Sequence, residues 1–191
     1  MKRQLTVAQE FGILVYRNKI GLLYHPKLLT VGAVIYDLIS SGKVELDNKN
    51  RINVINNFSE IESEQIVLKT LSKKKNRKLF LWIVWYYVTF NSKSVYQANI
   101  CKLKSSNSIS TAENIVQKIR AELLEDGNIY EGTVFLSFLL KKVNLLKKYF
   151  SKYESEDLNK TINRLKNEEC YKVYSIISKS ITILDIAVMS H

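Results

Sequence analysis

The sequence predicts a mainly α-helical protein, a single globular helical-bundle domain over residues 1–191 with one or more small β-hairpins. Its 191 residues are the length of one domain. It contains six glycines and one proline, too few for a disordered chain or a loop-rich all-β fold. Apolar residues recur at helical spacing along most of the chain, and no internal repeat or low-complexity linker divides it.

The first third of the chain predicts two helices followed by a hairpin. Thr6 and Gln9 fit a capping box at the start of a short helix. A second helix is expected over 28–41 and ends at Gly42, a residue that suits a left-handed C-cap. Two short segments with alternating apolar residues then flank a polar turn, which predicts a β-hairpin within 44–54.

Beyond the hairpin the pattern is helical throughout. The expected helices are 61–71, 79–90, 95–103, one capped by Ser110 and Glu113 that ends before Gly127, one from Thr133 that breaks at Asn144, a short one within 145–150, and two terminal helices with apolar faces at 158–165 and 173–188.

The positive charge is concentrated in the first half of the chain. The formal net charge is +11, and residues 1–104 hold 17 basic and 7 acidic side chains. No acidic residue occurs between Glu64 and Glu113, whereas nine basic residues fall there. Such an excess indicates an anionic partner, either a membrane surface or a nucleic acid.

A polybasic cluster stands directly before the most apolar stretch of the chain. The cluster consists of Lys73, Lys74, Lys75, Arg77 and Lys78. The run over 79–90 that follows contains Trp82 and Trp85. Basic residues gain about 1 kcal/mol each near an anionic leaflet, and Trp favours the headgroup boundary, so the cluster is predicted to bind lipid headgroups while Trp82 and Trp85 insert. The alternative interpretation is a buried core helix after a solvated loop, because apolar runs of about 10–14 residues are more often core.

The same run is well short of the roughly 20 residues of a spanning helix. The apolar N-terminal stretch has no signal-peptide cleavage site, so a cytoplasmic protein with peripheral membrane association is expected. Cys101 and Cys170 form no CxxC motif, which indicates a reducing compartment. The sequence has no glycine-rich phosphate loop, serine elbow or metal-spaced cluster, and its two histidines, His25 and His191, stand far apart. We therefore expect binding rather than catalysis, with no catalytic residue, no metal site and no cofactor.

Two longer segments carry a resemblance to a known family. They are 32–47 (GAVIYDLISSGKVELD) and 133–150 (TVFLSFLLKKVNLLKKYF). Both are similar to segments of the Golgi phosphoprotein family, the phosphatidylinositol-4-phosphate-binding Golgi adaptors and their bacterial relatives. The opening Leu5-Thr6, the terminal helix and the order of elements are also similar. The resemblance implies a mostly helical bundle with small hairpins and a binding activity.

Eukaryotic members of that family dock on phosphoinositide membranes and hold cytoplasmic tails of Golgi glycosyltransferases. The family's tryptophan and arginines fall near Leu22, at Val31, and near Asn114 and Gln117 in this chain. None of these side chains binds a phosphate as arginine does. The resemblance implies attraction to anionic membranes. Because the family's own phosphate-binding positions are replaced, the polybasic cluster is the expected site.

The first function that we predict is a peripheral membrane or adaptor protein that binds anionic lipid headgroups through the basic residues of 69–104, with a protein client as a further partner. The alternative is a nucleic-acid-binding protein, in which the unit 28–54 acts as a small winged element and the same lysines contact phosphates. A third hypothesis is a protein-binding module in which the aromatic run forms a partner groove. Lipid is favoured over nucleic acid because the hairpin carries only Lys43, Lys49 and Arg51, and no helix has a base-reading face.

Overall fold

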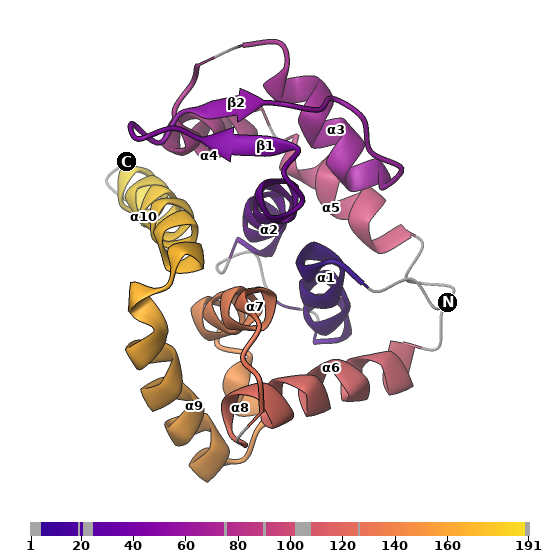
Figure 1. Cartoon of the computed structure of the whole chain (residues 1–191), viewed down its shortest axis with the longest axis vertical. Coiled ribbons are helices and arrows are strands. Elements are labelled where there is room, and N and C mark those ends of the chain that lie inside the picture. Colours follow the sequence, from indigo (N-terminus) through magenta and orange to yellow (C-terminus); the bar gives the residue numbers. More distant parts are fainter. Residues whose placement is uncertain are drawn as a thin grey trace.

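The protein is a mainly helical single domain with one small hairpin, as the sequence predicts (Figure 1). The computed structural model describes residues 5–18, 20, 25–74, 76–89, 91–101, 108–125 and 127–189. Over these residues the elements are α1 (Val7–Arg17), α2 (Pro26–Ser40), β1 (Val44–Leu46), β2 (Ile52–Val54), α3 (Glu62–Leu71), α4 (Leu79–Val88), α5 (Ser92–Cys101), α6 (Ser108–Leu123), α7 (Glu131–Lys142), α8 (Leu146–Tyr149), α9 (Lys152–Arg164), a 3-10 turn (Leu165–Asn167) and α10 (Glu169–Met189).

Helix α2 forms the centre of the molecule. It is surrounded by α1, α5, α7 and α10 in Figure 1, and it packs against α1, α3, α4, α5 and α10. Eleven of its fifteen residues are buried. Gly32 lies where α10 approaches most closely, because a Cβ at this position would meet Ile177 Cγ2 at 2.8 Å. The small residue at this position lets the central helix and α10 pack closely.

Three local predictions at the N-terminal end are confirmed. Thr6 and Gln9 form the capping box of α1. Gly42 follows α2 with a φ of 68°, the left-handed conformation that glycine adopts without strain. The hairpin has the expected strands, with Val44 opposite Val54 and Leu46 opposite Ile52. These features depend on residues close in sequence, which is why the pattern predicts them.

Several helix starts differ from the prediction. Helix α2 begins at Pro26, two residues before the expected start, and α5 begins at Ser92, three residues before its expected start. Helix α6 begins at Ser108, so Ser110 lies within its first turn and is not the N-cap of the predicted capping box. Helix α7 begins at Glu131, two residues before Thr133, because Tyr130 is already its N-cap. The predicted break at Asn144 is confirmed, since this residue has a φ of 56° between α7 and α8.

The aromatic-rich helix α4 contributes one face to the core and leaves another exposed. Leu79, Trp82, Ile83 and Tyr86 are buried, whereas Val88 is 64% exposed. The core interpretation of this run is thus confirmed for one side of the helix. Within the described part of the chain, none of the helices combines the length and the apolar character needed to span a bilayer.

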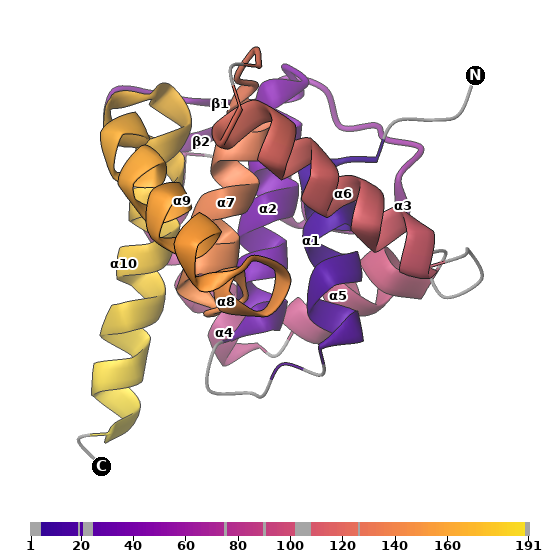
Figure 2. The same ribbon diagram turned by 90° about the horizontal axis from the view of Figure 1, so that it is seen from below.

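Helix α10 is the longest helix of the structure. Its first half packs against α7, and α4 and α2 also contact it. Its C-terminal end projects beyond the neighbouring elements (Figure 2). The hairpin and the loop between α3 and α4 lie together at a different edge, at the top of Figure 1.

Candidate functional site

The loop between α3 and α4, residues 72–78, is joined to the hairpin by main-chain hydrogen bonds. We call it the basic loop. Ile52 N donates to Arg77 O at 3.0 Å, and Leu79 N donates to Asn50 O at 2.9 Å. Arg51 and Lys78 form an isolated antiparallel bridge. The end of the loop is therefore joined to the two-stranded hairpin at one isolated bridge, and the basic residues of both segments are brought to one edge of the molecule.

Six described cations belong to this edge, which we call the basic end. They are Lys49 and Arg51 from the hairpin and Lys73, Lys74, Arg77 and Lys78 from the basic loop. Four of them are exposed, and the two arginines are half-buried. Over the residues that the structure describes, none of the six forms an ion pair. The basic end thus keeps its charge available to an external anion.

Asp47 is the acidic residue in the hairpin turn itself, and its carboxylate is bound to the backbone. Its Oδ1 atom accepts the backbone N–H groups of Lys49 and Arg51, both at 2.8 Å. The hydrogen bond from the Arg51 backbone N–H, with that from Lys49, lowers the pKa of Asp47 below its ordinary value. Asp47 therefore shapes the turn, although its charge offsets part of the positive charge nearby.

Arg77 is held in place by the core. Its guanidinium carbon lies 5.0 Å from the centroid of the Trp82 ring, within the range of a cation–π contact. Trp82 is 2% exposed. The arginine side chain is consequently fixed against the end of α4, whereas Lys73, Lys74 and Lys78 extend into solvent.

A groove of about 760 Å³ lies between β2 and the basic loop. Its lining is rich in amides: residues 52–57 include three asparagines, and Leu71, Ser72 and Asn76 form the opposite side. Ile55 lines the groove and is 60% exposed, and Phe58, just beyond it, is 64% exposed. One exposed apolar side chain, that of Ile55, therefore lies in a groove that the basic loop borders.

The structure brings together most of the predicted headgroup-binding residues and corrects the predicted insertion. Lys73, Lys74, Arg77 and Lys78 share one loop, and Lys75 lies outside the described residues. The prediction that Trp82 inserts into a membrane is wrong, because this side chain packs in the core. Trp85 is half-buried against the core, with its ring centroid 5.9 Å from that of Trp82, and its insertion stays a prediction.

The positions that match the family's binding residues do not form a phosphate site. Val31 is fully buried in α2, and Asn114 and Gln117 are exposed polar residues of α6. Leu22 lies outside the described residues. None of the three described side chains carries a charge, so the unpaired cations of the basic end are the better anion site.

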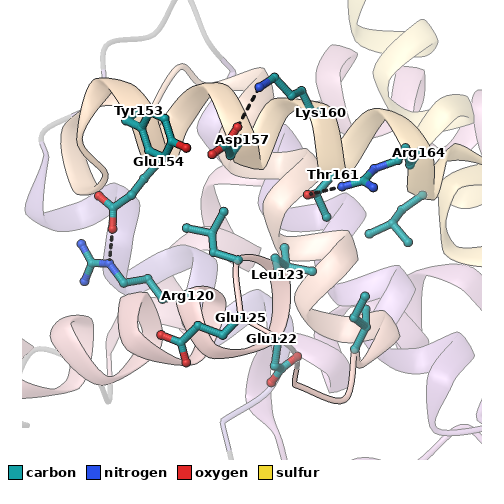
Figure 3. Close-up of a pocket in the computed structure, with 13 residues that line it drawn as sticks. Arg120, Glu122, Leu123, Glu125, Tyr153, Glu154, Asp157, Lys160, Thr161 and Arg164 are labelled. Atoms are coloured by element: carbon teal, nitrogen blue, oxygen red, sulfur yellow. Dashed lines mark hydrogen bonds and ion pairs between the residues drawn. The ribbon is translucent and has the colours of Figure 1, made fainter.

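A second hollow of about 680 Å³ lies between α6 and α9 (Figure 3). Its walls carry both signs of charge, which compensate one another. Arg120 Nε lies 2.7 Å from Glu154 Oε1, and Lys160 Nζ lies 2.8 Å from Asp157 Oδ1. The Arg120 guanidinium lowers the pKa of Glu154 to about 2. Four of its seven charged residues are paired with one another, and the other three, Glu122, Glu125 and Arg164, carry both signs. This hollow therefore selects no ligand class as clearly as the basic end does.

Comparison of the chain with models of protein families, with curated proteins and with solved structures found no match. The site is therefore argued from its own geometry. Sequence reasoning did not identify the asparagine-lined groove or the exposed Ile55 and Phe58. The signal available in the sequence was two apolar residues within an asparagine-rich segment that directly follows a strand.

Proposed function

We propose that the protein is a peripheral membrane protein that binds anionic lipid headgroups through the basic end, without catalysing a reaction. The observation that carries the proposal is the set of six unpaired cations on one edge, bordered by a groove that holds the exposed Ile55. Each cation near an anionic leaflet contributes about 1 kcal/mol, and an apolar side chain that enters the interface adds burial.

The apolar residues favour a membrane over a nucleic acid. A nucleic-acid groove combines cations with aromatic side chains on which bases stack. Ile55, the exposed apolar residue of the groove, is aliphatic and cannot stack in this way, whereas it can enter the acyl boundary of a bilayer. A relationship to the Golgi phosphoprotein family is part of the same proposal, and it is supported by the order α2, Gly42 and hairpin and by the helix break at Asn144.

The test is co-sedimentation with phosphatidylcholine vesicles that contain a graded fraction of phosphatidylserine, at low and at physiological salt. One variant changes Lys73, Lys74 and Lys78 to Ser and keeps Arg77, which packs on the core. The matched control changes Lys147, Lys148 and Lys152 to Ser, three exposed lysines on α8 and α9, and removes the same charge.

We expect binding of the wild type to rise with the anionic fraction and to fall with salt. The loss of three lysines at about 1 kcal/mol each predicts a decrease of more than tenfold for the first variant, with a much smaller effect in the control. Equal losses in both variants, or equal binding to neutral vesicles, would overturn the proposal. Salt-sensitive binding to DNA or RNA strands without vesicle binding would establish the nucleic-acid alternative.

A further inference from the structure

A pocket of about 890 Å³ lies where the N-terminal ends of α1 and α7 meet the C-terminal end of α2 and the side of α6. It is separate from the groove at the basic end, with which it shares no lining residue. Tyr36 lines it from α2 and Tyr130 from the start of α7. The ring of Tyr36 stacks on Phe135 at a centroid distance of 3.9 Å, which fixes this part of the pocket.

The lining of the pocket is acidic although the protein as a whole is strongly basic. Its charged residues are Glu10, Asp37, Glu64, Glu122 and Glu131 against Lys43 and Lys118. Each lysine is paired within the lining: Lys43 Nζ lies 2.7 Å from Glu64 Oε2, and Lys118 Nζ lies 3.1 Å from Glu10 Oε1. Three acidic residues are left without a cationic partner among the described side chains.

These three residues differ in how many of their carboxylate oxygens are free to accept a hydrogen bond. Asp37 accepts the backbone N–H groups of Val7 and Ala8 at 3.0 and 2.9 Å, so both of its oxygens are occupied. Glu122 accepts the N–H of Tyr130 through one oxygen at 3.3 Å. Glu131 is exposed at the first turn of α7. Glu122 and Glu131 therefore have oxygen atoms free to accept from a ligand.

A second, independent observation concerns Thr133, which also lines the pocket. Its side chain is fully buried, and its Oγ1 atom has no hydrogen-bond partner among the described residues. Buried hydroxyl groups are almost always hydrogen-bonded, by protein, water or ligand. The Thr133 hydroxyl is therefore available for a hydrogen bond with a polar group that enters this pocket.

The acidic residues of the pocket do not suit a metal ion. Over the described ranges, no three His, Cys, Asp or Glu side chains lie close enough together to hold a metal ion. Glu122 comes from α6 and Glu131 from α7, and two separate carboxylates suit a cation whose own charges are separated along a chain. The exposed ring of Tyr130 adds an aromatic face to which an ammonium group is attracted.

The geometry points to an aliphatic polyamine as the ligand of this pocket, with ammonium groups bound by Glu122 and Glu131 and one hydrogen bond made to Thr133. The bound chain lies along the apolar side chains Leu5 and Ile61, which also line the pocket. The positive charge of the remaining surface disfavours non-specific binding of such a cation, so occupancy of the pocket can be measured with little background.

Titration calorimetry with spermidine tests this inference. The double variant Glu122→Gln/Glu131→Gln removes both charges and keeps oxygen acceptors of similar shape, including the one for Tyr130 N. Its matched control is Glu156→Gln/Glu168→Gln, which changes two exposed acids that do not line the pocket. We expect the double variant to weaken spermidine binding at least tenfold and the control to bind like the wild type.

Thr133→Val separates a ligand contact from a structural role. Because Oγ1 makes no internal hydrogen bond, this isosteric change is expected to leave the midpoint of urea unfolding unchanged or higher, while spermidine binding weakens several-fold. Vesicle binding should be unaffected in all of these variants. Absence of spermidine binding to the wild type, equal weakening in the control, or displacement by an equal concentration of Mg²⁺ would overturn the proposal.

Discussion

The guanidinium carbon of Arg77 lies 5.0 Å from the centroid of the Trp82 ring. This contact joins the basic loop to the core, because Trp82 packs inside the molecule at the start of α4. The main-chain carbonyl of Arg77 accepts a hydrogen bond from Ile52 N of β2. One arginine therefore connects the hairpin, the basic loop and the core, while the neighbouring lysines remain free.

Arg77→Ser is expected to lower both the stability of the protein and its binding to anionic vesicles. Loss of a cation–π contact costs about 0.5–2 kcal/mol, depending on how far the cation is desolvated. Lys74→Ser is the control. Because Lys74 is exposed, this substitution should reduce vesicle binding and leave the unfolding free energy unchanged. Urea unfolding followed by tryptophan fluorescence measures the difference, and equal unfolding free energies of the two variants would contradict the structural role of Arg77.

Gly32→Ala is expected to destabilise the protein by about 1–3 kcal/mol, the usual cost of overpacking a core. The new Cβ would lie 2.8 Å from Ile177 Cγ2 and 2.9 Å from Ile177 Cδ1, so α2 and α10 would have to separate. The double variant Gly32→Ala/Ile177→Ala removes the clash. Its unfolding free energy should therefore exceed the value obtained by adding the two single effects, and strict additivity would show that the helices do not approach this closely.

Lys43→Met is expected to cost about 3–5 kcal/mol, because it leaves the buried carboxylate of Glu64 without its cation. Lys43 Nζ lies 2.7 Å from Glu64 Oε2, and Glu64 is 3% exposed. The double variant Lys43→Met/Glu64→Leu removes both charges and should recover much of the loss. Lys160→Met serves as the comparison, since its pair with Asp157 is exposed and its removal should have little effect on chemical denaturation.

The contribution of Asp37 to the stability of the protein is expected to fall as the pH rises from about 4 to about 7. Burial raises the pKa of this carboxyl group to about 7, against the opposing hydrogen bonds from the backbone N–H of Ala8, the side chain of Thr6 and the backbone N–H of Val7. Between the ordinary pKa and the raised one, Asp37 holds a proton in the folded protein but not in the unfolded chain. Its contribution to stability is therefore complete below the ordinary pKa and is lost as the pH rises through the pKa of the folded state.

The measurement is chemical denaturation at several pH values for the wild type and for Asp37→Asn, which does not titrate. As the pH rises, the unfolding free energy of the wild type should fall relative to that of the variant. Parallel pH profiles for the two proteins would show that the pKa of Asp37 lies near its ordinary value.

The elements of the fold were largely predictable, whereas the two sites were predictable only in part. The Thr6–Gln9 capping box, the Gly42 turn and the break at Asn144 are each formed by residues a few positions apart, so their signals survive in the linear sequence. The basic cluster was visible for the same reason. Its partner residues on the hairpin were not assigned to it, because the bridge between Arg51 and Lys78 joins segments that the sequence separates by all of α3.

By itself, the sequence determined the helical class, the hairpin and a concentration of positive charge in the first half of the chain. Only the tertiary structure decided that Trp82 is buried, that Ile55 lines a groove bordered by the basic loop, and that the Thr133 hydroxyl is enclosed without a partner among the described residues. The physical reason is that helix and turn signals act over a few residues. Burial and pocket formation depend instead on which distant elements pack together, and a single apolar run such as 79–88 is compatible with several packings until its neighbours are in place.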